Sequence, residues 1–159
     1  MKGLIYLRAL KVEDALVSYK WRNNPIIWRY TESRRNKIIT HEMETEWIKT
    51  VLKRKNEKRF AICVSENDNY IGNVQLTNID AAKAEFHIFI GDTDYWGRGI
   101  GKEATRKMVD IGFNKLNLKA IYLKVDKRNI SAIRSYQSVG FINYKAEGDQ
   151  IYMIINSNG

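Results

Sequence analysis

Alternating apolar and polar residues predict seven strands in this chain of 159 residues. The clearest run is 83–90, where apolar residues at the even positions alternate with Glu85, His87 and Phe89, the two-residue period of a strand. Comparable runs predict six further strands, at 3–9, 58–65, 69–78, 119–125, 140–145 and 149–155. Turn-forming residues between the strands of 58–90 favour an antiparallel meander there.

Apolar residues at helical spacing predict four helices, at 13–22, 40–53, 130–139 and from a glycine-rich segment near 100 to about 116. Thr40 and Asn129 are expected N-caps. Strand and helix alternate after residue 83, so parallel pairing with right-handed crossovers is expected in that half. The prediction is one α/β domain over 1–159, with a mixed, mostly antiparallel twisted sheet and helices on both faces.

The composition gives no sign of a second domain, a membrane span or a metal. Pro25 is the single proline, and no low-complexity segment marks a linker. No apolar run approaches the length of a membrane span, and the apolar start at 4–8 is too short for a signal peptide, so a cytoplasmic location is expected. Two histidines and Cys63 offer no metal-ligand spacing, and Cys63 is expected to be a packed thiol.

The formal net charge of +9 favours a polyanionic partner. Nucleic acid, an anionic cofactor and a nucleotide-linked substrate all satisfy this condition. Charge alone does not choose among them.

Three glycines at alternate positions, Gly97, Gly99 and Gly101, precede the third helix. They leave backbone N–H groups open at a helix N-terminus, where the helix dipole favours an anion. A dinucleotide fold would place such a loop after its first strand, and a Walker loop would follow Lys102 with Ser or Thr rather than Glu103. Both fit poorly, so the segment predicts an anion site without naming the anion.

A second pattern lies downstream of the glycines. Its members are Asn129, Ala132, Tyr136, Gly140 and Phe141. In this order, the two patterns resemble the GNAT superfamily of acetyl-CoA-dependent N-acetyltransferases. The resemblance implies the acyl-CoA N-acyltransferase fold, an acetyl-CoA-binding core at 58–145 and acceptor-side helices at 1–55. It departs at Trp96, where the family most often has Gln or Arg.

The resemblance also implies which residues hold acetyl-CoA, with no metal. Backbone N–H groups of the glycine loop would bind the pyrophosphate, with help from basic side chains. N–H groups near Ile88 and Phe89 would hold the thioester carbonyl, and the Asn129 side chain would contact the pantetheine arm. The implied residues are Ile88, Ile90, Trp96, Gly97, Arg98, Gly99, Ile100, Gly101, Lys102, Asn129 and Arg134.

Three residues are candidates for catalysis. Tyr136 lies on the apolar stripe of its helix, which is typical of a packing tyrosine, whereas the resemblance assigns its hydroxyl to protonation of the departing thiolate. Glu85 and His87 point to one face of their strand. Glu85 resembles the family's base, acting directly or through water, and His87 competes because its ordinary pKa is nearer neutrality. The two side chains could equally pair with each other.

The N-terminal part is expected to bind the acceptor, a small-molecule primary amine. The candidate acceptor-binding residues are Trp21, Arg22, Asn23, His41 and Trp47. The segment is similar to acetyltransferases of nucleotide-linked amino sugars, whose diphosphate suits the basic residues of 22–35, Arg34 and Arg35 included. It is more loosely similar to spermidine and ribosomal-protein acetyltransferases. A polyamine suits the acidic residues of 42–46, and a protein N-terminus is a further alternative.

Two other hypotheses concern partners. A non-catalytic nucleic-acid-binding module on the same fold is the alternative from another class, since the charge and the aromatic residues of the N-terminal part permit it; nucleic acid is the less favoured partner. A homodimer formed through the closing strands is the second hypothesis.

Overall fold

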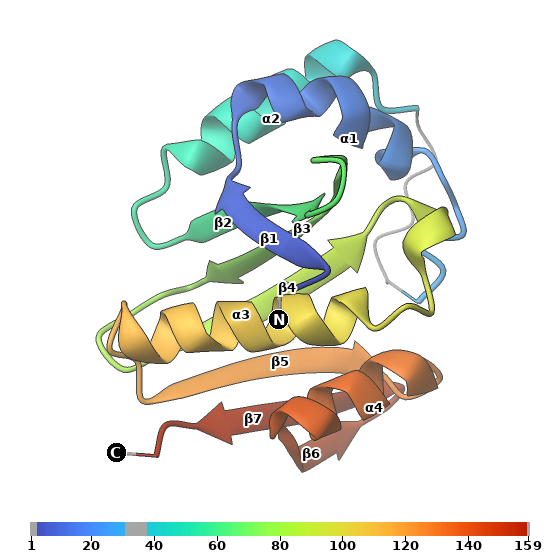
Figure 1. The fold of residues 1–159 in the computed structure, drawn as a ribbon. Helices are drawn as coiled ribbons and strands as arrows, with labels where there is room; N and C mark the ends of the chain where they lie inside the picture. The colour runs from blue at the N-terminus through green and yellow to red at the C-terminus, as the bar shows by residue number, and fades with distance from the viewer. Residues whose placement is uncertain (1–2, 31–37, 159) are drawn as a thin grey trace.

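The computed structural model describes residues 3–30 and 38–158, so Arg34 and Arg35 lie outside the described residues. Its centre is a seven-stranded sheet in the order β1-β2-β3-β4-β5-β7-β6 (Figure 1). The strands are β1 (Ile5–Ala9), β2 (Lys58–Val64), β3 (Tyr70–Thr77), β4 (Lys83–Ile90), β5 (Ala120–Asp126), β6 (Ile142–Glu147) and β7 (Gln150–Asn156). Neighbours are antiparallel except β4 and β5.

Helices cover both faces of the sheet, as the sequence predicted. They are α1 (Ala15–Arg22), α2 (His41–Leu52), α3 (Ile100–Asn114) and α4 (Ile130–Val139), with 3-10 turns at Val12–Asp14 and Thr93–Tyr95. The α1–α2 pair packs on Ala61 and Cys63 of β2, whereas Ile62 belongs to the core on the α3 side. This division follows from the alternation of side chains along a strand. Figure 1 shows α1 and α2 together at the top and α3 crossing below them.

The expected helix caps are present. The Thr40 hydroxyl accepts a hydrogen bond from the N–H of Met43 at 3.1 Å, and the Asn129 side chain accepts one from the N–H of Ala132 at 3.3 Å. Each bond satisfies a donor that the first turn of a helix leaves without an intrahelical partner. The Asn129 cap therefore fixes where α4 begins.

The parallel pairing expected in the second half is limited to β4 and β5. The other two pairings there, β5 with β7 and β6 with β7, are antiparallel. The reason is the closing hairpin: Gly148, at φ +58°, turns β6 into β7, and β7 inserts between β5 and β6. The expectation that β5 would pair directly with the strand after α4 was wrong, because β5 and β6 run in the same direction but β7 lies between them.

The strands β4 and β5 separate along their length. They pair only through Lys83↔Ala120, Ala84↔Ile121 and Glu85↔Tyr122, while β4 stays paired with β3 as far as Ile90. Figure 1 shows the end of β4 rising away from β5. The second half of β4 therefore has a free backbone edge, and α4 begins beside this opening.

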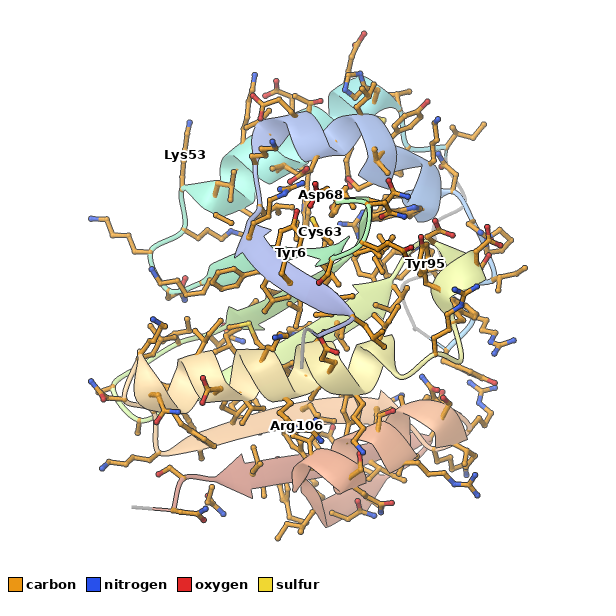
Figure 2. All side chains as sticks on the ribbon, in the orientation of Figure 1. Tyr6, Lys53, Cys63, Asp68, Tyr95 and Arg106 are labelled. Atoms are coloured by element: carbon orange, nitrogen blue, oxygen red, sulfur yellow. The ribbon has the colours of Figure 1, made fainter. Side chains whose placement is uncertain are left out.

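Cys63 is a packed thiol, as expected. It is fully buried and lies near Tyr6 and Asp68 in Figure 2, where the Tyr6 hydroxyl donates to the Asp68 carboxylate at 2.8 Å. Burial raises the pKa of the Cys63 thiol, which lowers its thiolate fraction and its reactivity. Within the described residues, no helix is both long and apolar enough to span a membrane.

Candidate active site

The glycine loop has the backbone geometry of an anion cradle. Gly97 and Gly99 have φ of +75° and +79°, the left-handed region that side chains disfavour. Gly99 is the N-cap of α3, and no side chain among the described residues caps that terminus. A Cβ added at Gly97, Gly99 or Gly101 would meet no atom within 4 Å. The N–H groups at the start of α3 are therefore open to a ligand.

Trp96 ties this loop to the sheet. Its indole N–H donates to the carbonyl oxygen of Ile90 at 2.9 Å, across the opening beside β4. The indole thus takes a fixed position at the point where the family most often has Gln or Arg. Arg98, the other large side chain in the loop, stacks on Tyr95 at 5.2 Å.

A groove of about 300 Å³ runs from the glycine loop along α4. Most of the expected acetyl-CoA residues line it, and the structure therefore brings them together. They are Ile88, Ile90, Trp96, Gly97, Gly99, Ile100, Gly101, Lys102 and Asn129. Arg98 and Arg134 are exposed and do not line the groove. We call this groove of about 300 Å³ the donor groove.

The free edge of β4 supplies backbone donors to the donor groove. The N–H of Gly91 donates to Ile71 in β3 at 2.7 Å, and the direction of N–H groups alternates along a strand. The N–H groups of Ile88 and Ile90 therefore point away from β3, into the opening where β5 has separated. Donors with this placement can hold a carbonyl oxygen.

A second cavity, of about 600 Å³, lies on the other side of β4; we call it the acceptor cavity. Its charged and aromatic walls come from β2, β4, β5, α1 and α2. The residues that line both cavities are Ile27, Tyr30, Ile88, Phe89, Asn129 and Tyr136. The two spaces therefore meet at Tyr136, where α4 faces the opened strands.

Tyr136 is held by aromatic packing. Its ring makes edge contacts with Phe86 and Phe141, each with a centroid separation of 5.9 Å. Burial raises the pKa of the phenol above its ordinary value, so the hydroxyl stays protonated at any physiological pH. Among the described residues, no side chain forms a hydrogen bond with this hydroxyl.

His87 lines the acceptor cavity, and Glu85 lies behind it. The Nε2 atom of His87 is 3.1 Å from the Thr77 hydroxyl and 3.5 Å from a Glu85 carboxylate oxygen. Desolvation lowers the pKa of His87 from its usual 6.5, and the charge of Glu85 opposes this shift. The imidazole is therefore neutral near pH 7. In that form one of its ring nitrogens carries no proton and can accept one. Glu85 lines neither cavity; Asn78 donates to it at 3.2 Å.

The expected acceptor residues divide into two groups. Arg22 and Trp47 line the acceptor cavity. Trp21 is buried, and its ring lies so close to Gly91 that an added Cβ would be 2.0 Å from it. The side chain of Asn23 bonds the backbone of Tyr19 and Ile39.

His41 is also remote from the acceptor cavity. It starts α2 and stacks near Tyr19 at 5.7 Å, and it lines neither cavity. The structure therefore gives Trp21 and Asn23 packing and tethering contacts, and it separates His41 from Trp47.

Sequence reasoning missed many residues of the acceptor cavity, among them Trp28, Arg59 and Lys124. Arg59 and Lys124 lie on strands whose alternation was recognised, so the polar face of each strand was a usable signal. Trp28 follows α1, outside any periodic segment, and no pattern marked it.

A groove with an anion cradle that meets a second cavity beside Tyr136 defines a transferase-type site for two substrates. The family model of the acetyltransferase (GNAT) domain matches residues 5–142. The chain therefore belongs to the GNAT acetyltransferase family, and it is an N-acetyltransferase dependent on acyl-CoA.

Proteins with related sequences or structures are consistent with this membership. Spermidine N(1)-acetyltransferase of Escherichia coli K12 is 31% identical over 138 residues, 86% of this chain and 72% of that protein. The uncharacterized N-acetyltransferase p20 of Bacillus licheniformis is 30% identical over 144 residues, 85% of this chain and 77% of that protein. The Vibrio cholerae spermidine N-acetyltransferase, solved with CoA and spermine, has a TM-score of 0.86 at 26% identity, covering 98% of this chain and 96% of that one.

Proposed function

We propose that this protein transfers the acetyl group of acetyl-CoA directly to a primary amine, with both substrates bound at once. One observation carries the proposal: the donor groove and the acceptor cavity share Tyr136 and the free edge of β4. Substrates held in these two spaces would meet at that point, which makes the reaction effectively intramolecular.

The donor groove suits coenzyme A. Acetyl-CoA supplies an acetyl group activated as a thioester. The open N–H groups around Gly99 and Gly101 suit its pyrophosphate, and Lys102 in the same wall adds a positive charge. The N–H groups of Ile88 and Ile90 would hold the pantetheine arm and the acetyl carbonyl oxygen.

His87 is the proposed base. An amine is mostly protonated at neutral pH, with an ordinary pKa of about 10, so its proton must be removed before it attacks. The neutral imidazole lines the cavity in which the amine would lie. Glu85, 3.5 Å from Nε2, is the proposed positioning residue, because it stabilises the imidazolium that proton uptake creates.

Tyr136 is the proposed acid. Its hydroxyl is protonated and lies in the wall that the two cavities share. From that position it can donate its proton to the sulfur that leaves the acetyl group. The amine would add to the thioester carbonyl carbon to form a tetrahedral intermediate, which would collapse as the sulfur leaves and takes up this proton.

Three kinds of primary amine are candidate acceptors: a polyamine, a nucleotide-linked amino sugar and a protein N-terminus. The names of the Escherichia coli and Vibrio cholerae relatives support a polyamine, and no relative named above supports a nucleotide-linked amino sugar or a protein N-terminus. Identities of 26–31% leave the acceptor open, so the chemistry of this chain's own cavity has to decide it. No observation specifically favours a nucleic-acid-binding module.

A thermal-shift titration tests the proposal. Micromolar acetyl-CoA should raise the unfolding temperature, because a ligand that binds only the folded state stabilises it. An absence of stabilisation together with salt-sensitive RNA binding would support the non-catalytic module instead.

A further inference from the structure

The acceptor cavity presents positive charge to its ligand. Its charged lining residues are Arg22, Arg59, Lys124 and Asp126. The acids that neutralise the two arginines, Glu44 and Glu57, do not line the cavity. The cations therefore form the wall, and most of the compensating anions stand behind it.

Arg22 is fixed with part of its guanidinium unused. Its Nε atom donates to both oxygens of Glu44 at 3.2 Å, and the Glu44 side chain is 3% exposed. The guanidinium lies 4.5 Å from the centre of the Trp47 ring and 5.2 Å from that of Trp28. The terminal nitrogens of Arg22 make no hydrogen bond within the described part of the chain, so they remain available to an anion.

Arg59 also lies against the indole ring of Trp47. Its Cζ atom is 5.1 Å from the centre of the Trp47 ring, and its guanidinium pairs with Glu57 at 2.8 Å. Burial is the main cause that lowers the pKa of Arg59, and the charge of Arg22 acts in the same direction. Two cations on one aromatic ring repel each other, and an anion placed between them would relieve that repulsion.

The opposite wall adds a cation and no available acid. Lys124 lines the cavity from β5, and no carboxylate in residues 3–30 or 38–158 forms an ion pair with it. Asp126 is the one carboxylate among the lining residues that the structure describes. Arg128 holds both of its oxygens, at 2.9 and 2.7 Å. An ammonium group entering the cavity would therefore find no unpaired acid.

Aromatic rings do not change this conclusion. Trp28, Trp47 and Phe89 could receive an ammonium group on their faces. The guanidinium of Arg22 already lies over all three, at 5.2, 4.5 and 5.5 Å. The acidic residues expected to hold a polyamine do not serve either, because Glu42 and Glu46 are exposed on α2 and line neither cavity.

We propose that the acceptor is a primary amine that also carries an acidic group, a phosphate or a carboxylate, which Arg22, Arg59 and Lys124 hold while the amine faces His87. This inference rests on the proposed function, since it names the substrate class of the same site. It separates this protein from its relatives named for spermidine, whose acceptor carries only positive charge. An extra ammonium group would be repelled where an acidic group is attracted.

The test is binding of four small amines of similar size to the wild-type protein saturated with coenzyme A, measured by calorimetry. The amines are β-alanine, phosphoethanolamine, propylamine and diaminopropane, with acetyl transfer from acetyl-CoA measured in parallel. At least one of the two acidic amines should bind about tenfold more tightly than diaminopropane. Preference between β-alanine and phosphoethanolamine identifies the acidic group as carboxylate or phosphate.

Charge-reversal variants assign the effect to the cavity. Lys124→Glu should remove the preference for the acidic amine or reverse it. The matched control is Lys127→Glu, because Lys127 is exposed, pairs with Asp149 at 3.5 Å and does not line the cavity; it should keep the wild-type order. Thermal unfolding of both variants checks that they are folded.

The results distinguish a failure of the inferred substrate class from a failure of the proposed acetyl transfer. Diaminopropane binding as tightly as the acidic amines, failure of both acidic amines to bind, or equal effects of the two lysine variants would overturn the inference. Ordered binding without any acetyl transfer would leave the inference standing and contradict the proposed function instead.

Discussion

Tyr136 is half-buried and combines aromatic packing with a place in the walls of both cavities. Phe86 and Phe141 fix its ring, and burial keeps the phenol protonated by raising its pKa. The sequence pattern identified this residue, although its position on an apolar stripe was equally typical of packing. The structure is compatible with both a packing role and an acid role, because the ring packs while the residue lines both cavities.

Tyr136→Phe removes the proposed acid and keeps the ring. We expect kcat to fall by about 10²- to 10⁴-fold, the usual contribution of general acid catalysis, with acetyl-CoA affinity nearly unchanged. Steady-state kinetics and a thermal-shift titration measure the two quantities. Tyr144→Phe is the control, because Tyr144 is 52% exposed on β6. Full activity in the Tyr136 variant would rule out the acid role.

The choice between Glu85 and His87 could not be made from the sequence. Alternation places both on one strand face, but it does not say how far the cavity extends along that face. The structure ends the cavity at His87 and leaves Glu85 behind the imidazole. The depth of a cavity depends on packing between distant elements, which no local pattern encodes.

The pH dependence of kcat tests His87. Desolvation lowers the pKa of His87 below 6.5, so the base is lost only as pH falls through that lower value. We expect kcat to hold down to pH 6.5 and to decline below it, and His87→Gln to lower kcat and abolish this acidic limb. An acidic limb that persists in the variant would assign the base elsewhere, and Glu85→Gln would then be the next variant to measure.

At the scale of elements, the sequence predicted nearly all helices and strands close to their observed bounds, because periodicity and caps are local signals. It did not predict that β7 would insert between β5 and β6. Strand order depends on pairing between segments far apart in the chain. The loop before α3 was predicted as an anion site because its glycines leave backbone N–H groups open at a helix N-terminus.

Gly99→Ala tests the loop as a cradle. Gly99 has φ +79°, and an added Cβ would enter open space. The variant should lose about 1 kcal/mol of folding stability from backbone strain and bind acetyl-CoA more weakly. Gly148→Ala is the matched control. Gly148 has φ +58° and equally open surroundings, so the substitution causes comparable strain, but this residue lies in the β6–β7 turn.

Denaturant unfolding and acetyl-CoA titration separate the two effects of these glycine variants. Both variants should be destabilised to a similar extent, while only Gly99→Ala should lose affinity for acetyl-CoA. Equal affinity in the two variants would show that the cradle does not bind the donor.

At the scale of the whole molecule, the charge of +9 predicted an anionic partner without locating it. The structure distributes this charge unevenly: in the acceptor cavity the cations face inward and Glu44 and Glu57 stand behind them. Sequence order hides part of this arrangement, because Arg22 in α1 and Glu44 in α2 are 22 residues apart. Composition therefore predicted the sign of a partner's charge, and the fold indicates where a group of that charge would bind.

The homodimer stays a prediction. Every residue of the edge strand β6 is exposed, including Ile142 at 61%, and such an edge can pair with another copy. Light scattering should give the mass of a dimer or larger assembly for the wild-type protein, and Ile142→Lys should lower it. A monomeric wild-type protein would remove the hypothesis.

The central claim is that one site binds acetyl-CoA and an amine together and transfers the acetyl group between them. The most direct measurement is the release of free coenzyme A thiol from acetyl-CoA, with and without a panel of primary amines that includes acidic amines and polyamines. We expect thiol release that depends on the amine, saturates with both substrates and falls sharply in Tyr136→Phe. Thiol release that no amine accelerates, or that is unchanged in Tyr136→Phe, would contradict it.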